Sequence, residues 1–284
     1  MTAGARACIY CGADEKLTSE HVFGDWTRKY VERTYQKYSF QSVIAPSPGQ
    51  AVGKPVKIRA GDPLNSQIKA VCAKCNSGWM SQIQERAKPF LIPLFEGSPR
   101  VLGRDAQRRI ATWASLASMT AEFISRDPVD VSIPQFERAK IMARSRPSNS
   151  FRVWIGKYER EKWGGQWRHG TIPIYSSNEI EEASRGAHAP NHQTTSFTIG
   201  KLFVHVFSGH FRHIIARWDW QNALRALSAL KQIWPIENNV VHWPGTTMTD
   251  ADAQLFSNAF ILRSEQIAAK AGWYSFSGEG GNAN

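Results

Sequence analysis

The sequence contains no run of about eighteen apolar residues, so it offers no candidate for a membrane-spanning helix. Residues 1–7 lack the apolar core of a signal peptide. The sequence also lacks internal repeats and a glycine-rich phosphate loop, and so gives no support for an ATP-driven enzyme. These absences predict a cytoplasmic protein without a membrane partner.

Cysteine is scarce as well, and all four cysteines lie in two C-x-x-C pairs, Cys8/Cys11 and Cys72/Cys75, with 60 residues between the pairs. A two-residue gap lets both thiolates of a pair turn toward one ion, and two pairs complete a tetrahedral zinc site. Two disulfides or a redox pair are the alternatives. The missing export signal disfavours disulfides, and a redox pair does not need a second C-x-x-C. The pattern predicts structural zinc.

Acidic residues are outnumbered by basic ones, 24 against 35, which gives a net charge of +11. The excess lies in residues 1–168, with 27 basic and 15 acidic residues, whereas residues 169–284 hold 8 and 9. Such a basic surface is either simply solvated or suited to the phosphate backbone of nucleic acid.

Ser19-Glu20-His21-Val22 lies between the two pairs, and Asn76 directly follows the last cysteine. This order, C-x-x-C, then an acidic residue before histidine, then C-x-x-C-N opening a helix, resembles the HNH endonuclease family over about residues 8–90. The resemblance implies a treble-clef zinc site carrying a ββα-metal motif that hydrolyses phosphodiester bonds. It makes double-stranded DNA the expected partner, in a bacterial or phage-infected cell, with a phage or defence role.

The resemblance also implies the roles of three residues. His21 matches the general base that takes a proton from the attacking water, a task that suits imidazole at neutral pH. Glu20 and Asn76 match the ligands of a catalytic divalent ion, for which Mg²⁺ or Mn²⁺ suits oxygen donors.

The sequence departs from the family pattern at these positions. Glu20 stands where the family usually has Asp, and the family's middle Asn has no clear match in this sequence, Asn65 being near its place. Asn76 is alternatively an ordinary helix N-cap, and His21 an ordinary polar residue at a strand end. A zinc-stabilised module that binds DNA without cutting it stays open, as does a structural or interaction protein that zinc merely holds together.

We expect an α+β fold with a domain boundary near residue 98. Residues 1–97 form the predicted zinc-bound HNH-like domain, with Trp79 and Met80 in its core. Its expected elements are a short helix at 24–33, a loop at 44–64, strands at 56–59 and 68–71, and a helix from Asn76 that Pro89 interrupts.

Residues 98–284 form the predicted accessory or target-recognition domain, with a mainly antiparallel sheet. Its helices are expected at 104–126, 134–145, 221–233 and 250–271, and its strands at 151–157, 171–175, 195–207 with a turn near 200, and 211–218; the tail from Ser275 is expected to be disordered.

Several side chains outside the motif are candidates for binding nucleic acid. The basic candidates are Arg28, Lys29, Arg33, Arg104, Arg108 and Arg109. Four tryptophans are candidates for stacking on bases, with packing in the core as the alternative: Trp163, Trp167, Trp218 and Trp220. His205, His210 and His213 resemble a cluster, and we interpret them as paired sheet residues.

Overall fold

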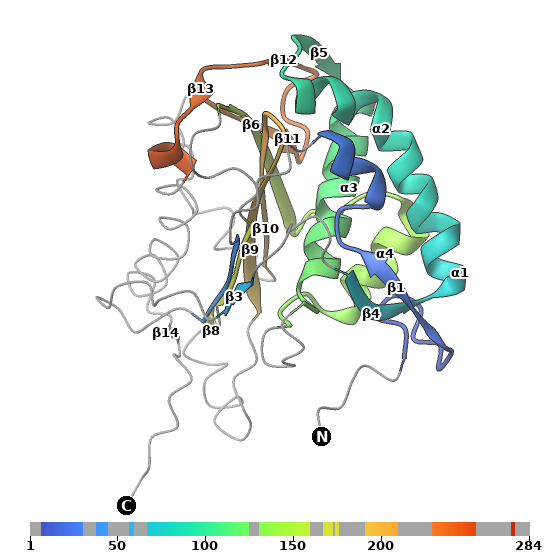
Figure 1. Ribbon diagram of the computed structural model, residues 1–284. Helices are drawn as coiled ribbons and strands as arrows, with labels where there is room; N and C mark the ends of the chain where they lie inside the picture. The colour runs from blue at the N-terminus through green and yellow to red at the C-terminus, as the bar shows by residue number, and fades with distance from the viewer. Residues whose placement is uncertain are drawn as a thin grey trace, which may run out of the picture.

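The computed structural model describes residues 7–30, 38–44, 57–59, 67–124, 131–159, 167–172, 174–175, 191–209, 229–253 and 274–275. Helices cover one face of a large sheet, and the segment that carries the cysteines lies at one end of this helical layer (Figure 1). None of the described helices is both long enough and apolar enough to cross a membrane.

The cysteine-bearing segment begins with two paired strands. Strand β1 (Leu17–His21) pairs antiparallel with β4 (Gln67–Cys72), with a register shift between Thr18 and Ser19. In β4, Gln67 is exposed and Ile68 is buried, as expected for a strand with one solvent face. This strand confirms the one predicted at 68–71.

A helix follows β4 directly. It starts as α1 (Ala73–Cys75), passes through the π-helical turn η3 (Asn76–Met80) and continues as α2 (Ser81–Glu96). The prediction that Pro89 interrupts this helix is wrong, because α2 runs through Pro89 and Pro93. Burial of one face outweighs the backbone hydrogen bonds that the prolines remove. That face is Ile83, Ala87, Leu91, Leu94 and Phe95.

The remaining helices agree with the predicted pattern. The short helix η1 (Asp25–Tyr30) is a 3₁₀ helix within the predicted 24–33. Helix α3 (Arg104–Ala121) is buried almost throughout its second half, and α4 (Gln135–Arg144) follows it. Trp113 of α3 meets Phe197 of the sheet edge-on, with ring centroids 5.7 Å apart, so α3 lies directly on the sheet.

In the part of the chain that the structure describes, the large sheet has eight strands in the order β11-β6-β10-β9-β7-β2-β3, with β13 beside β6. The pairings are antiparallel except those of β2 with β7 and of β13 with β6. Its strands are β2 (Tyr38–Ile44), β3 (Lys57–Arg59), β6 (Phe151–Tyr158), β7 (Trp167–Ile172), β9 (His192–Ile199), β10 (Leu202–Gly209), β11 (Leu230–Trp234) and β13 (Thr247–Met248).

The described residues also form two small strand pairs apart from the large sheet and the β1–β4 pair. Strand β12 (Val240–Trp243) pairs with β5 (Arg100–Gly103) beside the start of α3, and β14 (Tyr274–Ser275) pairs with β8 (Ile174–Tyr175). The fold therefore mixes helices and sheets whose strands are mainly antiparallel, as predicted.

The C-terminal elements differ in part from the predicted ones. The helix expected at 221–233 is wrong over its last residues, because residues 230–234 form strand β11 beside β6. Helical structure begins at 250 as predicted, whereas most of 250–271 and all of 211–218 lie outside the described residues. The predicted tail after Ser275 also lies outside them.

The buried core is continuous across residue 98, from Cys8 to Trp243. Strands β2 and β3 come from the first 97 residues but join the sheet that the later strands build. The turn between β9 and β10 contacts the end of α2, where the Lys201 N–H donates to the Phe95 carbonyl at 2.8 Å. The domain boundary near residue 98 stays a prediction, and the described residues on its two sides share one core.

Candidate functional site

The two C-x-x-C pairs are held by different backbone structures. In the first, a tight turn brings the Gly12 N–H to the Cys8 carbonyl at 2.8 Å, with Gly12 at a left-handed φ of 73° that favours glycine. The Ile9 N–H donates to the Ala70 carbonyl at 3.0 Å, which fixes this turn to β4. In the second pair, Cys72 ends β4 and Cys75 lies on the first helical turn.

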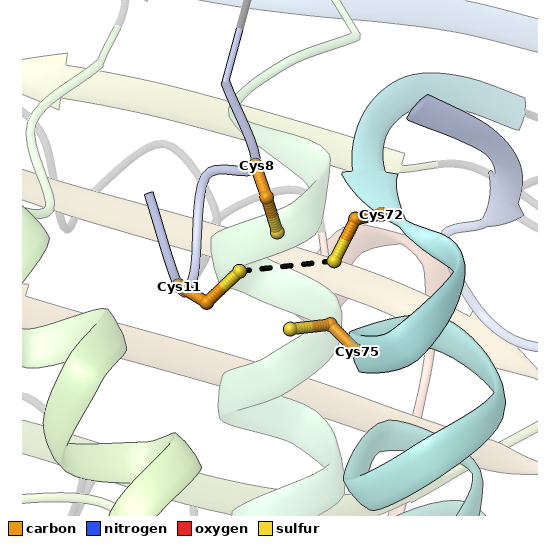
Figure 2. A group of neighbouring side chains, drawn as sticks. All are labelled: Cys8, Cys11, Cys72 and Cys75. Atoms are coloured by element: carbon orange, nitrogen blue, oxygen red, sulfur yellow. Dashed lines mark hydrogen bonds between the residues drawn. The ribbon is translucent and has the colours of Figure 1, made fainter. Parts of the chain in front are cut away.

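These structures bring the four sulfurs together (Figure 2). All four Sγ atoms lie within 4.8 Å of one another, and those of Cys11 and Cys72 are 3.7 Å apart. Zinc–sulfur bonds of about 2.3 Å place the corners of a tetrahedron roughly 3.8 Å apart, whereas a disulfide bond needs roughly 2.0 Å. The thiols are free, so the group could hold a metal ion such as zinc.

Burial and backbone amides change the pKa values of the buried thiols by different amounts and in different directions. Burial acts to raise the pKa of Cys8, but hydrogen bonds from the backbone of Cys11, Cys72 and Tyr10 outweigh it and bring that pKa to about 7. Burial raises the pKa of Cys75 to about 12, against the opposing effect of Trp79. A bound cation would favour the thiolate form of all four.

Aromatic packing fixes the cysteine group to the helical layer. Tyr10 meets Trp79 edge-on at 5.1 Å between ring centroids, and its hydroxyl lies 2.8 Å from the Thr120 hydroxyl of α3. Full burial raises the pKa of Tyr10, so it stays a neutral phenol. Met80 is buried and Trp79 packs against the core, which confirms the prediction for both residues.

Glu20 and Asn76 lie together beside the cysteine group. Burial raises the pKa of Glu20 to about 7, and a hydrogen bond from the Asn76 side chain opposes that rise. Asn76 Nδ2 also donates to Thr18 Oγ1 at 3.1 Å, so the amide oxygen is the part of Asn76 left to accept or coordinate. The alternative of a helix N-cap is wrong for Asn76, because the extended Cys72 occupies that position and Asn76 is helical.

His21 has different neighbours from Glu20. Its Nε2 lies 2.7 Å from the side-chain amide of Gln67 and 3.8 Å from Asp25 Oδ1, and its side chain is 23% exposed. Successive strand residues point to opposite faces, which separates the ring from the Glu20 carboxyl. Among the described residues, no hydrogen bond or ion pair links His21 to Glu20 or Asn76.

The basic candidates fall into two groups. In the first, Arg28 donates to Asp25 at 2.8 Å and Lys29 lies over the Tyr30 ring. In the second, on the first turns of α3, Arg108 and Arg109 both bind Asp105, and Arg104 Nη1 donates to Asn239 Oδ1 at 2.6 Å. Arg33 and Asn65 lie outside the described residues.

His205 is a core residue. It lies on β10, which runs between β9 and β6, and its side chain is buried. Its Nδ1 is 2.7 Å from Ser196 Oγ and its Nε2 is 3.1 Å from Thr194 Oγ1. Burial lowers its pKa to about 3, so the ring is neutral. Of the other candidates, the backbone of Trp167 lies in β7, and the rest fall outside the described residues: His210, His213, Trp163, Trp218 and Trp220.

The sequence did not point to three residues that contact the motif side chains. Thr18 contacts Asn76, whereas Asp25 and Gln67 contact His21. Gln67 lies directly opposite His21 in the β1–β4 register. Only that register reveals the contact, since the long segment between the strands hides their pairing in the sequence. No protein family, curated protein or solved structure matched the chain.

Proposed function

We propose that this chain is a metal-dependent HNH-type endonuclease that hydrolyses phosphodiester bonds in DNA, with its zinc in a treble-clef arrangement. The supporting observation is that Glu20 and Asn76 lie close together at the junction of β1, β4 and the helix, next to four clustered cysteines. Free thiols at this group suit a reducing compartment such as the cytoplasm.

Glu20 and Asn76 form the proposed site for the catalytic ion. A carboxylate oxygen and an amide oxygen are hard donors of the kind that Mg²⁺ and Mn²⁺ prefer. A divalent ion bound there would stabilise negative charge on the phosphate and on the leaving 3′ oxygen. Because Nδ2 donates to Thr18, the amide oxygen is the atom that Asn76 would offer to this ion.

His21 is the proposed general base. Its ring would take a proton from water, whose oxygen attacks phosphorus as the bond to the 3′ oxygen breaks; solvent then protonates that oxygen. Since Gln67 occupies Nε2, the nitrogen that would accept the proton is Nδ1. Nε2 would then carry a hydrogen, and the Gln67 side-chain amide, whose Nε2 is the atom that lies 2.7 Å from the ring, would have to turn its oxygen toward that hydrogen.

A second candidate is a zinc-stabilised module that binds DNA without cutting it. The observation in its favour is the orientation of His21, which faces Gln67 and Asp25 rather than the Glu20–Asn76 pair. Cleavage requires the phosphate to bridge these two faces of β1, or β1 to rearrange when DNA binds.

Cleavage of supercoiled plasmid with added Mg²⁺ or Mn²⁺ tests the proposal, with His21→Ala as the comparison. We expect ion-dependent cutting by the native protein and none by the variant, with equal zinc content and duplex binding in both. Native protein that binds zinc and duplex but never cuts would favour the binding module. Failure to bind duplex at all would leave a zinc-held structural protein.

A further inference from the structure

A pocket of about 460 Å³ lies at the start of α3, against the end of β11 and the loop between α4 and β6. None of the motif residues lines it. Its wall is formed by Arg104, Asp105, Arg108, Arg146, Asn149, Trp234, Pro235 and Ile236.

The loop that carries Arg146 and Asn149 is fastened at two points. On one side the Ser145 carbonyl accepts a hydrogen bond from Thr112 Oγ1 of α3 at 3.3 Å. On the other side the Trp234 indole N–H donates to the Ser148 carbonyl at 2.9 Å. The pocket is therefore formed before any ligand arrives, which lowers the entropy lost on binding.

The charge of the pocket favours an anion. Three arginines and one carboxylate line the pocket, so positive charge is in excess. The carboxylate, Asp105, already forms salt bridges with Arg108 and Arg109. Arg104 is hydrogen bonded to a neutral amide, that of Asn239. Within the described residues, neither Arg104 nor Arg146 forms a salt bridge, so their charges remain available to a phosphate.

One part of the wall is apolar and includes an aromatic ring. Trp234, Pro235 and Ile236 form it, and the Trp234 ring is held in place by its bond to Ser148. The volume lies within the roughly 300–1,000 Å³ of small-ligand pockets, which admits one nucleotide but not a duplex. A nucleotide could place its phosphate against the arginines and its base against the apolar part of the wall.

We propose that this pocket binds one unpaired nucleotide of a nucleic-acid strand. The choice of nucleic acid rests on the proposed function. Arg104 precedes Thr120, the α3 residue that contacts Tyr10 beside the cysteines, by sixteen residues, or about 24 Å of helix. The pocket is thus a separate contact that would hold a strand at a distance from the motif.

The test is fluorescence anisotropy of a labelled, 5′-phosphorylated oligothymidylate, competed with thymidine monophosphate. Arg146→Gln removes one pocket charge at an exposed position, and Arg144→Gln removes a charge that is also exposed but lies outside the pocket. We expect Arg146→Gln to weaken binding about tenfold, as for loss of one charge-assisted contact, and Arg144→Gln to change it less than about twofold. Equal losses, or none, would overturn the proposal.

Competitors separate a nucleotide from other phosphorylated ligands. Thymidine monophosphate should compete well, whereas thymidine and inorganic phosphate should each compete poorly, since each offers half of the contacts. Inorganic phosphate or a phosphoserine peptide competing as strongly as the nucleotide would overturn the assignment. The assay needs no cleavage, so selective loss in Arg146→Gln supports the pocket even if His21→Ala and native protein behave alike on plasmid.

Discussion

The Asn76 side chain lies close enough to the buried carboxyl group of Glu20 to oppose the rise in its pKa that burial causes, and both residues lie next to the cysteine group. Asn76 directly follows Cys75 at the start of the helix, whereas Glu20 lies on β1. Zinc at the cysteines would therefore set the position of the pair, because the same backbone carries both. Structural and catalytic ions would depend on one small set of elements.

Glu20→Gln tests the ion site directly. The amide keeps the size of the side chain and its contact with Asn76 but removes the charge that binds a divalent cation. We expect ion-dependent plasmid cleavage to fall at least about a hundredfold, roughly 2.7 kcal/mol of transition-state stabilisation. Glu15→Gln, which removes an exposed acid before the same strand, is the matched control. Equal activity in the two variants would remove Glu20 from the site.

Cys72→Ser tests the role of the cysteine group in folding. Structural zinc contributes roughly 10–16 kcal/mol in small zinc domains, as much as the whole stability of a typical protein. We expect the variant to lose zinc, measured by atomic emission, and to lose ordered structure around β1 and β4, measured by hydrogen exchange. Lys74→Ala, an exposed change within the same C-x-x-C, should retain both. A zinc-loaded, well-protected Cys72→Ser protein would contradict the four-cysteine site.

The cysteine group could be predicted because its geometry follows from local spacing. Within each C-x-x-C the two-residue gap sets the sulfurs side by side, and the chemistry of four soft ligands predicts that the two pairs meet at one ion. Placement of Glu20 near Asn76 followed from the order of motifs that resembles the HNH family. The contact of His21 with Gln67 did not, since it depends on the register of β1 against β4.

The two wrong element predictions have the same physical origin. Leu230 and Ile233 are spaced as on a helix, but both are buried in β11, where pairing with β6 decides the structure. A side chain at Gly156 would meet Leu230 Cδ2 at 2.9 Å, so that glycine makes room for β11. At Pro89, tertiary burial of α2 likewise outweighs a local rule.

Gln67→Ala tests whether Gln67 positions His21. Without the contact at Nε2, the ring loses its fixed orientation and tautomer, while substrate contacts are unchanged. We expect kcat for cleavage to fall about tenfold with KM nearly constant. Lys69→Ala changes another exposed side chain of β4 and should leave both quantities as they are. A change confined to KM would instead assign Gln67 to substrate binding.

His205 should make the protein sensitive to acid. Burial lowers its pKa to about 3, against about 6.5 in the unfolded chain, so between these values the unfolded state binds more protons. The free energy of unfolding must then rise with pH over this interval, by roughly 1.4 kcal/mol per pH unit for this one histidine. His169, buried with its pKa also near 3, acts in the same direction.

Urea unfolding of native protein and His205→Gln between pH 4.5 and 6 measures this slope. We expect the variant to be less stable at pH 6, because Ser196 and Thr194 lose their fitted partner, yet to have a slope smaller by roughly 1.4 kcal/mol per pH unit. The two effects can be separated. The lost hydrogen bonds lower the free energy of unfolding by the same amount at every pH, whereas the lost histidine changes its slope against pH, which counts the protons taken up on unfolding. A variant that keeps the native slope would show that His205 titrates as freely in the folded protein as in the unfolded chain, which its burial between β9 and β6 does not allow.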